Sequence, residues 1–280
     1  MTEFEQIVFG RSAIPALLIT VLMLIAIPVG AFLWWRRTHK AQTKLGWLVA
    51  GAVGFLLSAR VLELGVHYFC IVSDNPVSRF LNGNTAAFVV YGALMAGIFE
   101  ECGRHIVLKY ALKQDRTREN AVLYGIGHGG VEILAVLLPA LISYLVIAVL
   151  FTQTDVKTAL RSLQITEETA SAALPAIQAA AAFDYGMMAL NVVERLLTML
   201  VHVGLTVIVY YGVVKEKKGC LPAAIALHAL TDLFAALYQR GVAPLWSVEV
   251  WAALCTAVIW ILAGRLYRTM RPQRDTQSAL

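Results

Sequence analysis

The sequence predicts an all-α integral membrane protein, a polytopic bundle of about seven transmembrane helices. Of its 280 residues, 59% are hydrophobic and only 15% are charged, whereas soluble domains are about half apolar and about a quarter charged. Several apolar runs reach the roughly 20 residues that a helix needs to cross a hydrocarbon layer. The net charge of +5 does not indicate nucleic-acid binding, because the basic residues stand at the ends of the apolar runs. We therefore expect residues 1–280 to form a single integral-membrane domain with the lipid bilayer, and not nucleic acid, as its surroundings.

The apolar runs define the positions of the spans. The predicted spans are about Ser12–Trp35, Leu45–Val72, Thr85–Tyr110, Asn120–Phe151, Leu190–Val214, Cys220–Gln239 and Val242–Tyr267. The fourth is long enough to tilt, or to kink near Pro139. The connection at about 152–189 is interpreted as a helical or re-entrant segment, and its Ala-rich stretch would make an eighth span if it crossed the membrane.

Lys and Arg residues alternate between the two ends of the spans. On one side they are Arg36, Arg37, Lys40, Lys44, Lys109, Lys113, Arg116, Arg118, Lys215, Lys217, Lys218, Arg265, Arg268, Arg271 and Arg274. On the other side they are Arg11, Arg79, Lys157, Arg161 and Arg240. Cytoplasmic loops carry an excess of basic residues, so this roughly threefold bias predicts an odd number of spans, an outer N-terminus and a cytoplasmic C-terminus. We expect a multi-pass protein of a bacterial plasma (inner) membrane.

Ionisable residues inside the spans are the main indication of function. Such groups cost a few kcal/mol or more in a bilayer unless they are paired or hydrated, so a functional site is the default interpretation. The candidate site residues are Glu100, Glu101, Arg104, His128, Glu132, His202, His228 and Asp232. The three histidines lie about 8 to 13 residues from the predicted cytoplasmic ends, a depth of roughly 12 to 20 Å. We therefore expect the helices within 86–239 to form one site in a layer nearer the cytoplasmic face.

Spacing along the helices predicts which of these side chains share a face. His128 and Glu132 are four residues apart, as are His228 and Asp232, so each pair lies on one helix face. Arg104 stands one turn after Glu100, and we expect it to pair with that acid and keep it ionised, while Glu101 points about 100° away. Four glycines around His128, at 125, 127, 129 and 130, predict a close approach of neighbouring helices.

Two further polar groups receive a mainly structural interpretation. Arg60, Glu63 and His67 in the second span stand at helical spacing, and they are interpreted as a set that neutralises itself. Glu194 and Arg195 in the fifth span are interpreted either as an ion pair or as part of the site.

The site residues leave two chemistries open. A carboxylate beside imidazoles can take a proton from water while a histidine shares the proton or stabilises the oxyanion. Alternatively His128, His202 and His228, with Glu132 or Asp232, would supply three imidazoles and an oxygen to zinc with one open position. His-x-x-x-Glu is not the His-Glu-x-x-His signature of common zinc proteases, so the sequence assigns no metal, and zinc stays possible.

The order of these motifs resembles the YhfC family of membrane proteases, and it is similar to the PrsW and CAAX-prenyl-protease (CPBP, Abi-like) glutamic intramembrane peptidases. The resemblance runs from Phe99 to Asp232: Glu-Glu-x-x-Arg, a Gly-rich His-x-x-x-Glu, Arg195 with His202, and His-x-x-x-Asp. It implies Glu100 or Glu101 as the base, His128 or His202 as its partner, and His228 with Asp232 as the stabilising pair, with Arg104 orienting the acids.

This sequence also departs from the CAAX-type pattern. That pattern has one more spacer residue before its Arg, and His128-x-x-x-Glu132 replaces its Phe-x-x-x-His. Glu132 would then hold the functional position, which leaves the partner of the base open.

The favoured function is therefore an intramembrane peptidase, a hydrolase of the glutamic type, that cuts a membrane protein or peptide. A zinc-dependent membrane protease is the first alternative. The second is a proton- or cation-coupled transporter, in which the same acids and imidazoles would relay protons. The sequence contains no inverted repeat of the kind that would favour a transporter, and it does not determine the oligomeric state.

Overall fold

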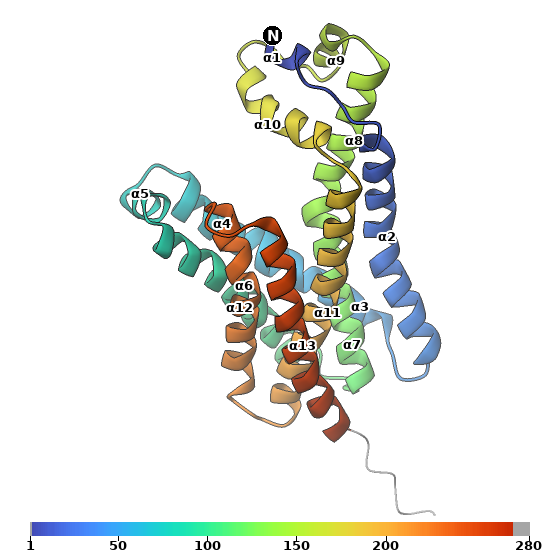
Figure 1. Cartoon of the computed structure of the whole chain (residues 1–280). Helices are drawn as coiled ribbons and strands as arrows, with labels where there is room; N and C mark the ends of the chain where they lie inside the picture. The colour runs from blue at the N-terminus through green and yellow to red at the C-terminus, as the bar shows by residue number, and fades with distance from the viewer. Residues whose placement is uncertain (1, 271–280) are drawn as a thin grey trace, which may run out of the picture. The chain divides into compact units, whose positions relative to one another are not determined.

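The computed structural model describes residues 2–270, and every regular element within them is a helix (Figure 1). Seven helical segments are long and apolar enough to cross a membrane: Ala13–Thr38, Leu45–Val72, Thr85–Ala111, Arg118–Gln153, Tyr185–Val214, Cys220–Gln239 and Leu245–Thr269. These agree with the seven predicted spans, except that the fifth begins several residues earlier. Arg271 and Arg274, part of the predicted basic clusters, lie outside the described residues.

Three of the spans are interrupted by short π-helical turns. The second span comprises α3 (Leu45–Phe55), η1 (Leu56–Glu63), α4 (Leu64–His67) and η2 (Tyr68–Val72). The third comprises α6 (Thr85–Ile106) and η3 (Val107–Ala111), and the fourth α7 (Arg118–Glu132), η4 (Ile133–Leu137) and α8 (Leu138–Gln153). The remaining helices are α1 (Thr2–Glu5), α2 (Ala13–Thr38), α5 (Pro76–Gly83), α9 (Val156–Ser162), α10 (Ala170–Ala181), α11 (Tyr185–Val214), α12 (Cys220–Gln239) and α13 (Leu245–Thr269).

Pro139 explains the interruption of the fourth span. Proline has no amide hydrogen and its ring collides with the carbonyl four residues earlier, so a regular helix cannot run through it. The structure places the π-helical turn η4 directly before it, and α8 begins with Pro139 in its first turn. The predicted position of the irregularity is confirmed.

The contacts divide the chain into two compact units. The first unit holds the residues up to Ile27 together with Ile133–Arg195, and the second holds Pro28–Glu132 together with the chain from Leu196 onward. The boundaries fall inside α2 and α11 and between α7 and η4. The expectation of a single domain stays a prediction.

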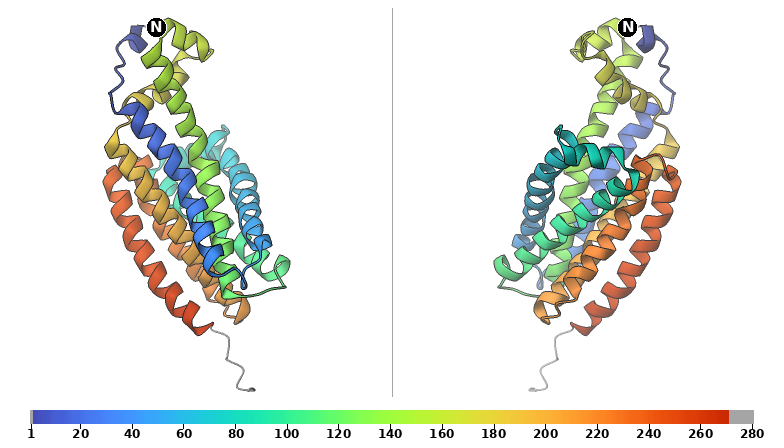
Figure 2. Two further views of the ribbon diagram at one scale, coloured as in Figure 1. Left: turned by 90° about the vertical axis from the view of Figure 1, so that its right-hand side faces the viewer. Right: turned by 90° about the vertical axis from the view of Figure 1, so that its left-hand side faces the viewer.

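The first unit has an apolar core. Its centre is formed by Phe4, Ile147, Leu160, Ile177 and Ala180, which join α1, α8, α9 and α10. These four helices lie together in both views of Figure 2.

The connection at 152–189 is helical, as predicted, and consists mainly of α9 and α10. Asp155 caps α9: it accepts hydrogen bonds from the amide and the hydroxyl of Thr158 at 3.0 and 2.6 Å. The hydroxyl bond lowers the pKa of the Asp155 carboxyl below its ordinary value. α10 has 12 residues, a length of about 18 Å, which is shorter than the roughly 30 Å hydrocarbon layer. It does not form the eighth span that the Ala-rich stretch left open.

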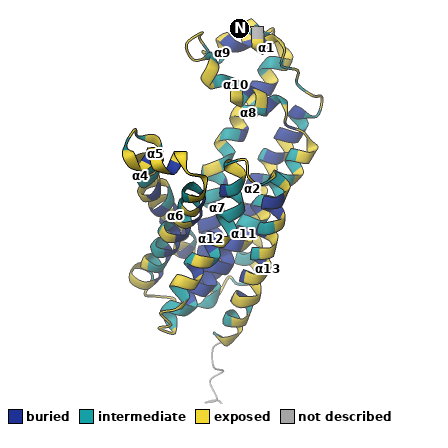
Figure 3. Cartoon of the chain, turned by 60° about the vertical axis from the view of Figure 1, so that its left-hand side comes forward, coloured by how far each residue is buried: buried dark blue, intermediate teal, exposed yellow. Residues whose placement is uncertain are grey.

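α7 is the central helix of the second unit. All residues from Asn120 to Gly130 are buried (Figure 3), and a helix that is covered on every side lies inside a bundle. The predicted close approach at its glycines is confirmed. A Cβ atom on Gly127 would lie 2.0 Å from the carbonyl oxygen of Leu48 on α3, and one on Gly125 would lie 2.8 Å from Cα of Val203 on α11.

The outer helices of the second unit present apolar side chains outward. On α13, Leu254, Val258 and Ile261 are 58%, 48% and 58% exposed, and the same helix lies beside α12 in the two views of Figure 2. Lipid chains are as apolar as these side chains. The pattern therefore agrees with a helix that faces the bilayer.

Several of the predicted basic ends meet at one end of the second unit. Nη1 of Arg118, at the start of α7, donates to the carbonyl of Tyr267 near the end of α13 at 3.1 Å. Nε1 of Trp35, near the end of α2, donates to the carbonyl of Glu119 at 3.0 Å. This confirms that the ends of the first and seventh spans and the start of the fourth lie together. Which side of a membrane they face stays a prediction.

Candidate functional site

Six buried polar side chains from four helices of the second unit form one cluster. They are Glu100, Glu101 and Arg104 from α6, His128 from α7, His202 from α11 and His228 from α12. Glu132 and Asp232 lie at its edge, with side chains 19% and 34% exposed. The structure therefore brings all eight predicted site residues together.

Glu101 is held by two partners. Nη1 of Arg104 lies 2.6 Å from both of its carboxylate oxygens, and Nδ1 of His228 lies 2.8 Å from Oε1. Glu101 and Arg104 are both fully buried. Because an isolated buried charge costs several kcal/mol, this pairing is a condition for placing the two ions in the interior.

The expected pairing of Arg104 with Glu100 is wrong. Residues three apart and four apart on a helix are both neighbours, and the guanidinium turns to Glu101, three residues earlier. The reason lies on another helix, because Nε2 of His128 forms a 2.9 Å hydrogen bond with Oε2 of Glu100. Spacing along α6 could not show this, because the competing partner comes from α7.

Arg104 also fixes the protonation pattern of His202. Its Nη2 lies 2.9 Å from Nδ1 of His202, and arginine can only donate. Nδ1 of His202 must therefore accept, which places the ring proton on Nε2. Nε2 pairs with Glu132, so the imidazole donates to that carboxylate.

His228 has the complementary pattern. Its Nδ1–H donates to Glu101, since that carboxylate is ionised beside Arg104. Its Nε2 lies 3.5 Å from Oδ2 of Asp232. His202 and His228 thus each donate one ring N–H to a carboxylate. The other ring nitrogen of His202 accepts from Arg104, and that of His228 faces Asp232.

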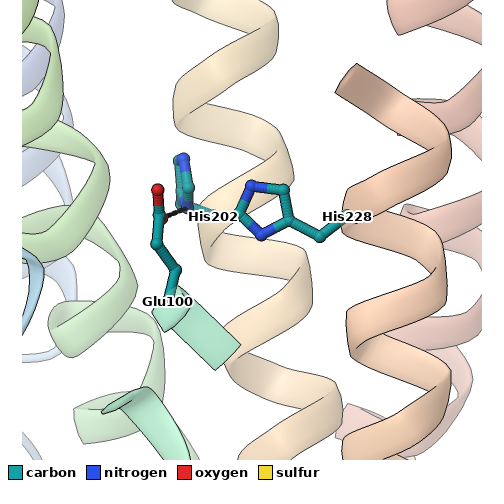
Figure 4. A group of neighbouring side chains, drawn as sticks. All are labelled: Glu100, His202 and His228. Carbon is teal, nitrogen blue, oxygen red and sulfur yellow. Dashed lines mark ion pairs between the residues drawn. The ribbon is translucent and has the colours of Figure 1, made fainter. Parts of the chain in front are cut away.

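A carboxylate that orients an imidazole in this way is the usual support of a metal-binding histidine. Glu100, His202 and His228 can each present one ligand atom, and these atoms all lie within 4.8 Å of one another (Figure 4). Nδ1 of His202 is 3.8 Å from Oε2 of Glu100. Two imidazoles and one carboxylate form a donor set of catalytic zinc sites, which keep a fourth position open. These residue types therefore fit a zinc ion, while Nδ1 of His202, the nitrogen that faces Glu100, accepts from Arg104 in this structure.

This group differs from the predicted zinc ligands His128, His202 and His228. Glu100 takes the place of His128, whose Nε2 is already bonded to that carboxylate. Nδ1 of His128 has no hydrogen-bond partner among the described residues, and the ring lies edge-on to Phe55 with centroids 5.2 Å apart. His128 thus holds the carboxylate of Glu100 through this hydrogen bond and is not itself a member of the ligand group.

Two glycines leave space for His202 and His228. A Cβ atom on Gly129 would lie 3.1 Å from Cβ of His202, and one on Gly97 would lie 2.8 Å from the carbonyl oxygen of Ile225 and 3.6 Å from Cβ of His228. The sequence interpretation included Gly129 but missed Gly97. Its position one turn before Glu101 was the available signal.

Two further polar groups of the spans form local pairs. Arg195 pairs with the neighbouring Glu194, and both belong to the first unit. A joint role of Arg195 with His202 stays a prediction. His67 pairs with Glu63 at 3.1 Å, as expected from their spacing.

Comparisons with known proteins identify a family and a similar protein. A family model described as YhfC intramembrane metalloprotease matches residues 23–252, which include all eight predicted site residues. The chain is 31% identical over 242 residues to the uncharacterized membrane protein YhfC of Bacillus subtilis (strain 168), and the match covers 85% of this chain and 91% of that protein. No solved structure matches the chain.

Proposed function

Because the chain belongs to the YhfC family of intramembrane metalloproteases, we propose that it hydrolyses a peptide bond of a membrane protein or peptide at the group formed by Glu100, His202 and His228. The observation that carries the proposal is the convergence of these three ligand atoms within 4.8 Å in a buried cluster. Their chemistry is that of a zinc site with two imidazoles and a carboxylate.

Zinc held by these three residues would supply Lewis acidity that polarises a substrate carbonyl and makes a water molecule more acidic. The side chains of the protein orient the two imidazoles. Glu101 accepts from Nδ1–H of His228, and Glu132 accepts from Nε2–H of His202. These bonds fix which ring nitrogen carries the proton and how each ring is turned.

Arg104 and His128 have supporting roles in the proposal. Arg104 balances the charge of Glu101 inside the bundle, so that a carboxylate can orient His228 without remaining an uncompensated buried charge. His128 holds Glu100 by a 2.9 Å hydrogen bond. Burial of the cluster excludes bulk water, which strengthens each of these electrostatic interactions.

One observation favours the metal-free glutamic mechanism as a second candidate. Nη2 of Arg104 donates to Nδ1 of His202, the atom that would otherwise be a ligand. In this version Glu100 takes a proton from water and His128 shares it through the same 2.9 Å contact. Glu100 is central to both candidates, whereas His202 and His228 are ligands in only one.

The membrane topology completes the proposal. The basic ends of the spans favour a cytoplasmic C-terminus and an outer N-terminus in a bacterial plasma membrane.

Metal content separates the two candidates. Elemental analysis of the detergent-purified protein is expected to find about one zinc per chain, as one ligand set implies. His202→Ala and His228→Ala should lose it. The comparison variant is His128→Ala, which removes an equally buried imidazole outside the ligand group. Because Glu100 loses its hydrogen-bond partner, zinc should bind about 10- to 100-fold more weakly without being lost. A thermal unfolding curve of each variant verifies that it is folded.

The contrary result would be a folded wild-type protein that cleaves peptides without metal and is unaffected by chelators. Glu100→Gln, but not His202→Ala, would then be expected to abolish cleavage, and the glutamic mechanism would replace the metal mechanism. Absence of any cleavage by metal-loaded protein would count against the protease function itself.

A further inference from the structure

A cavity of about 410 Å³ adjoins the buried cluster in the second unit. Its volume lies within the range of about 300–1,000 Å³ that is typical of ligand pockets. It is lined by side chains of the second span, α6 and α12. Asp232 belongs to both places: its side chain lines the cavity, and its Oδ2 lies 3.5 Å from Nε2 of His228.

The charge of this cavity is negative. Asp232 is the charged residue among those that line it, and the described lining contains no lysine or arginine. Arg240 contacts Phe88, one of the lining residues. Its guanidinium carbon lies 4.7 Å from the centroid of the Phe88 ring, and its Nη2 donates to the carbonyl of Asn82 at 2.7 Å.

A second polar chain lines the same cavity. Nε2–H of His67 donates to Glu63 at 3.1 Å, so its Nδ1 accepts the hydroxyl proton of Tyr91 at 2.8 Å. The Tyr91 oxygen, which also has a side-chain hydrogen bond with Cys70, can then act as an acceptor. His67 and Tyr91 both line the cavity, and they lie beside the π-helical segments η1 and η2, a type of distortion that is frequent at functional sites.

The remaining walls suit a hydrocarbon stem. Ile71, Phe88, Ala235 and Ala236 are apolar, and Gly92 leaves space where a side chain would otherwise stand. A long side chain with a cationic end buries its methylene groups along such a surface while the charge reaches a polar partner. The ring of Tyr91 adds a favourable contact for a cation.

We propose that this cavity binds a lysine or arginine side chain of the substrate close to the cut bond, with Asp232 as its counter-ion and the Tyr91 hydroxyl as a second acceptor. The inference rests on the proposed protease function. The contact between Asp232 and His228 places the bound residue within one or two positions of that bond, because an extended chain advances only about 3.3–3.6 Å per residue. The expected substrate is thus a membrane-associated peptide with a basic residue at the site of cleavage.

The test uses binding, which is separable from cleavage. The protein is the Glu100→Gln variant in detergent, and the probes are fluorescent leucine–alanine peptides with one central lysine, norleucine or glutamate. Fluorescence anisotropy is expected to show that the lysine peptide binds about tenfold more tightly than the norleucine peptide, the ratio that about 1.4 kcal/mol provides. The glutamate peptide should bind most weakly.

Matched variants locate the effect. Asp232→Asn should abolish the preference for lysine, whereas Asp74→Asn, at an exposed carboxylate paired with Arg79, should retain it. Ala235→Phe fills the cavity and should weaken binding of every peptide. Leu230→Phe, on an exposed position of the same helix, should leave binding unchanged.

Equal affinity for the lysine and norleucine peptides would overturn the inference, as would a preference for lysine that survives Asp232→Asn. Failure of the protease proposal is distinguishable, since it would appear as absent cleavage by the wild-type protein while the binding preference persists. In that case the cavity would still be a cation-selective peptide site. A protein that cleaves norleucine and lysine peptides equally well and binds them equally would remain a protease without this specificity.

Discussion

The buried cluster of the second unit and the core cluster of the first unit consist of different kinds of side chain. The core of the first unit consists of apolar residues such as Leu160 and Ile177. The second unit places Glu101, Arg104 and His128 at positions with no exposed surface. Apolar burial is non-directional and tolerates many arrangements, whereas buried ions are stable only when each finds a correctly placed partner. The comparison teaches that the buried cluster depends more than the apolar core on the exact placement of each partner.

The partners in the second unit form a connected network. Arg104 contacts both Glu101 and His202, and Glu101 in turn contacts His228. Glu100 joins through its ion pair with His202. Removal of one member therefore leaves several polar atoms unsatisfied. In the first unit, removal of one side chain leaves only a cavity.

The largest effect is expected from Arg104→Met. This change leaves Glu101 as an uncompensated buried charge, and breaking a buried pair in this way costs about 3–5 kcal/mol. Chemical unfolding in detergent micelles, followed by tryptophan fluorescence, measures the loss.

The double variant Arg104→Met with Glu101→Leu is the control. Replacement of both ions by apolar groups of similar size is often close to neutral, so much of the stability should return. His228 would lose its orienting carboxylate, and zinc binding should stay weak. A double variant as unstable as the single one would mean that the charge of Glu101 is not the cause.

The first unit should respond in a simpler way. Ile177→Ala removes a fully buried side chain from its core and is expected to cost about 2–5 kcal/mol through lost burial and a residual cavity. Zinc content per folded molecule should not change, because the residue has no part in the cluster.

Ile142→Ala is the matched control for that change, since Ile142 is 45% exposed on α8. Its effect should be within about 0.5 kcal/mol, as for other surface substitutions. If Ile142→Ala were as destabilising as Ile177→Ala, the apolar core of the first unit would be wrongly assigned.

The smallest effect is expected from glycine substitutions in the second unit. Gly127→Ala brings a methyl group to 2.0 Å from the carbonyl of Leu48, so α3 and α7 must separate, and overpacking of this kind costs about 1–3 kcal/mol. Gly46→Ala on α3 meets nothing within 4 Å and should be neutral or slightly stabilising. Unfolding midpoints of the two variants, measured side by side, give the difference; equal midpoints would contradict the close approach.

Much of the fold could be predicted because a bilayer restricts the possibilities. Long apolar runs become helices, since every backbone group must be paired inside a hydrocarbon layer. The helix irregularity before Pro139 and the helix contacts at Gly125 and Gly127 follow from local chemistry in the same way. The early start of α11 at Tyr185 was missed, because its first turns follow the helical α10 connection without a sharp change in composition.

The sequence by itself determined which residues meet in the buried cluster, because charged groups in apolar helices have few other reasons to occur. Only the tertiary structure decided their partners. His128 and Glu132 share one face of α7, yet the first pairs with Glu100 and the second with His202. Spacing fixes the angle of a side chain around its own helix. The rotation and depth of the facing helices, set by packing at glycines such as Gly97 and Gly129, fix what that side chain meets.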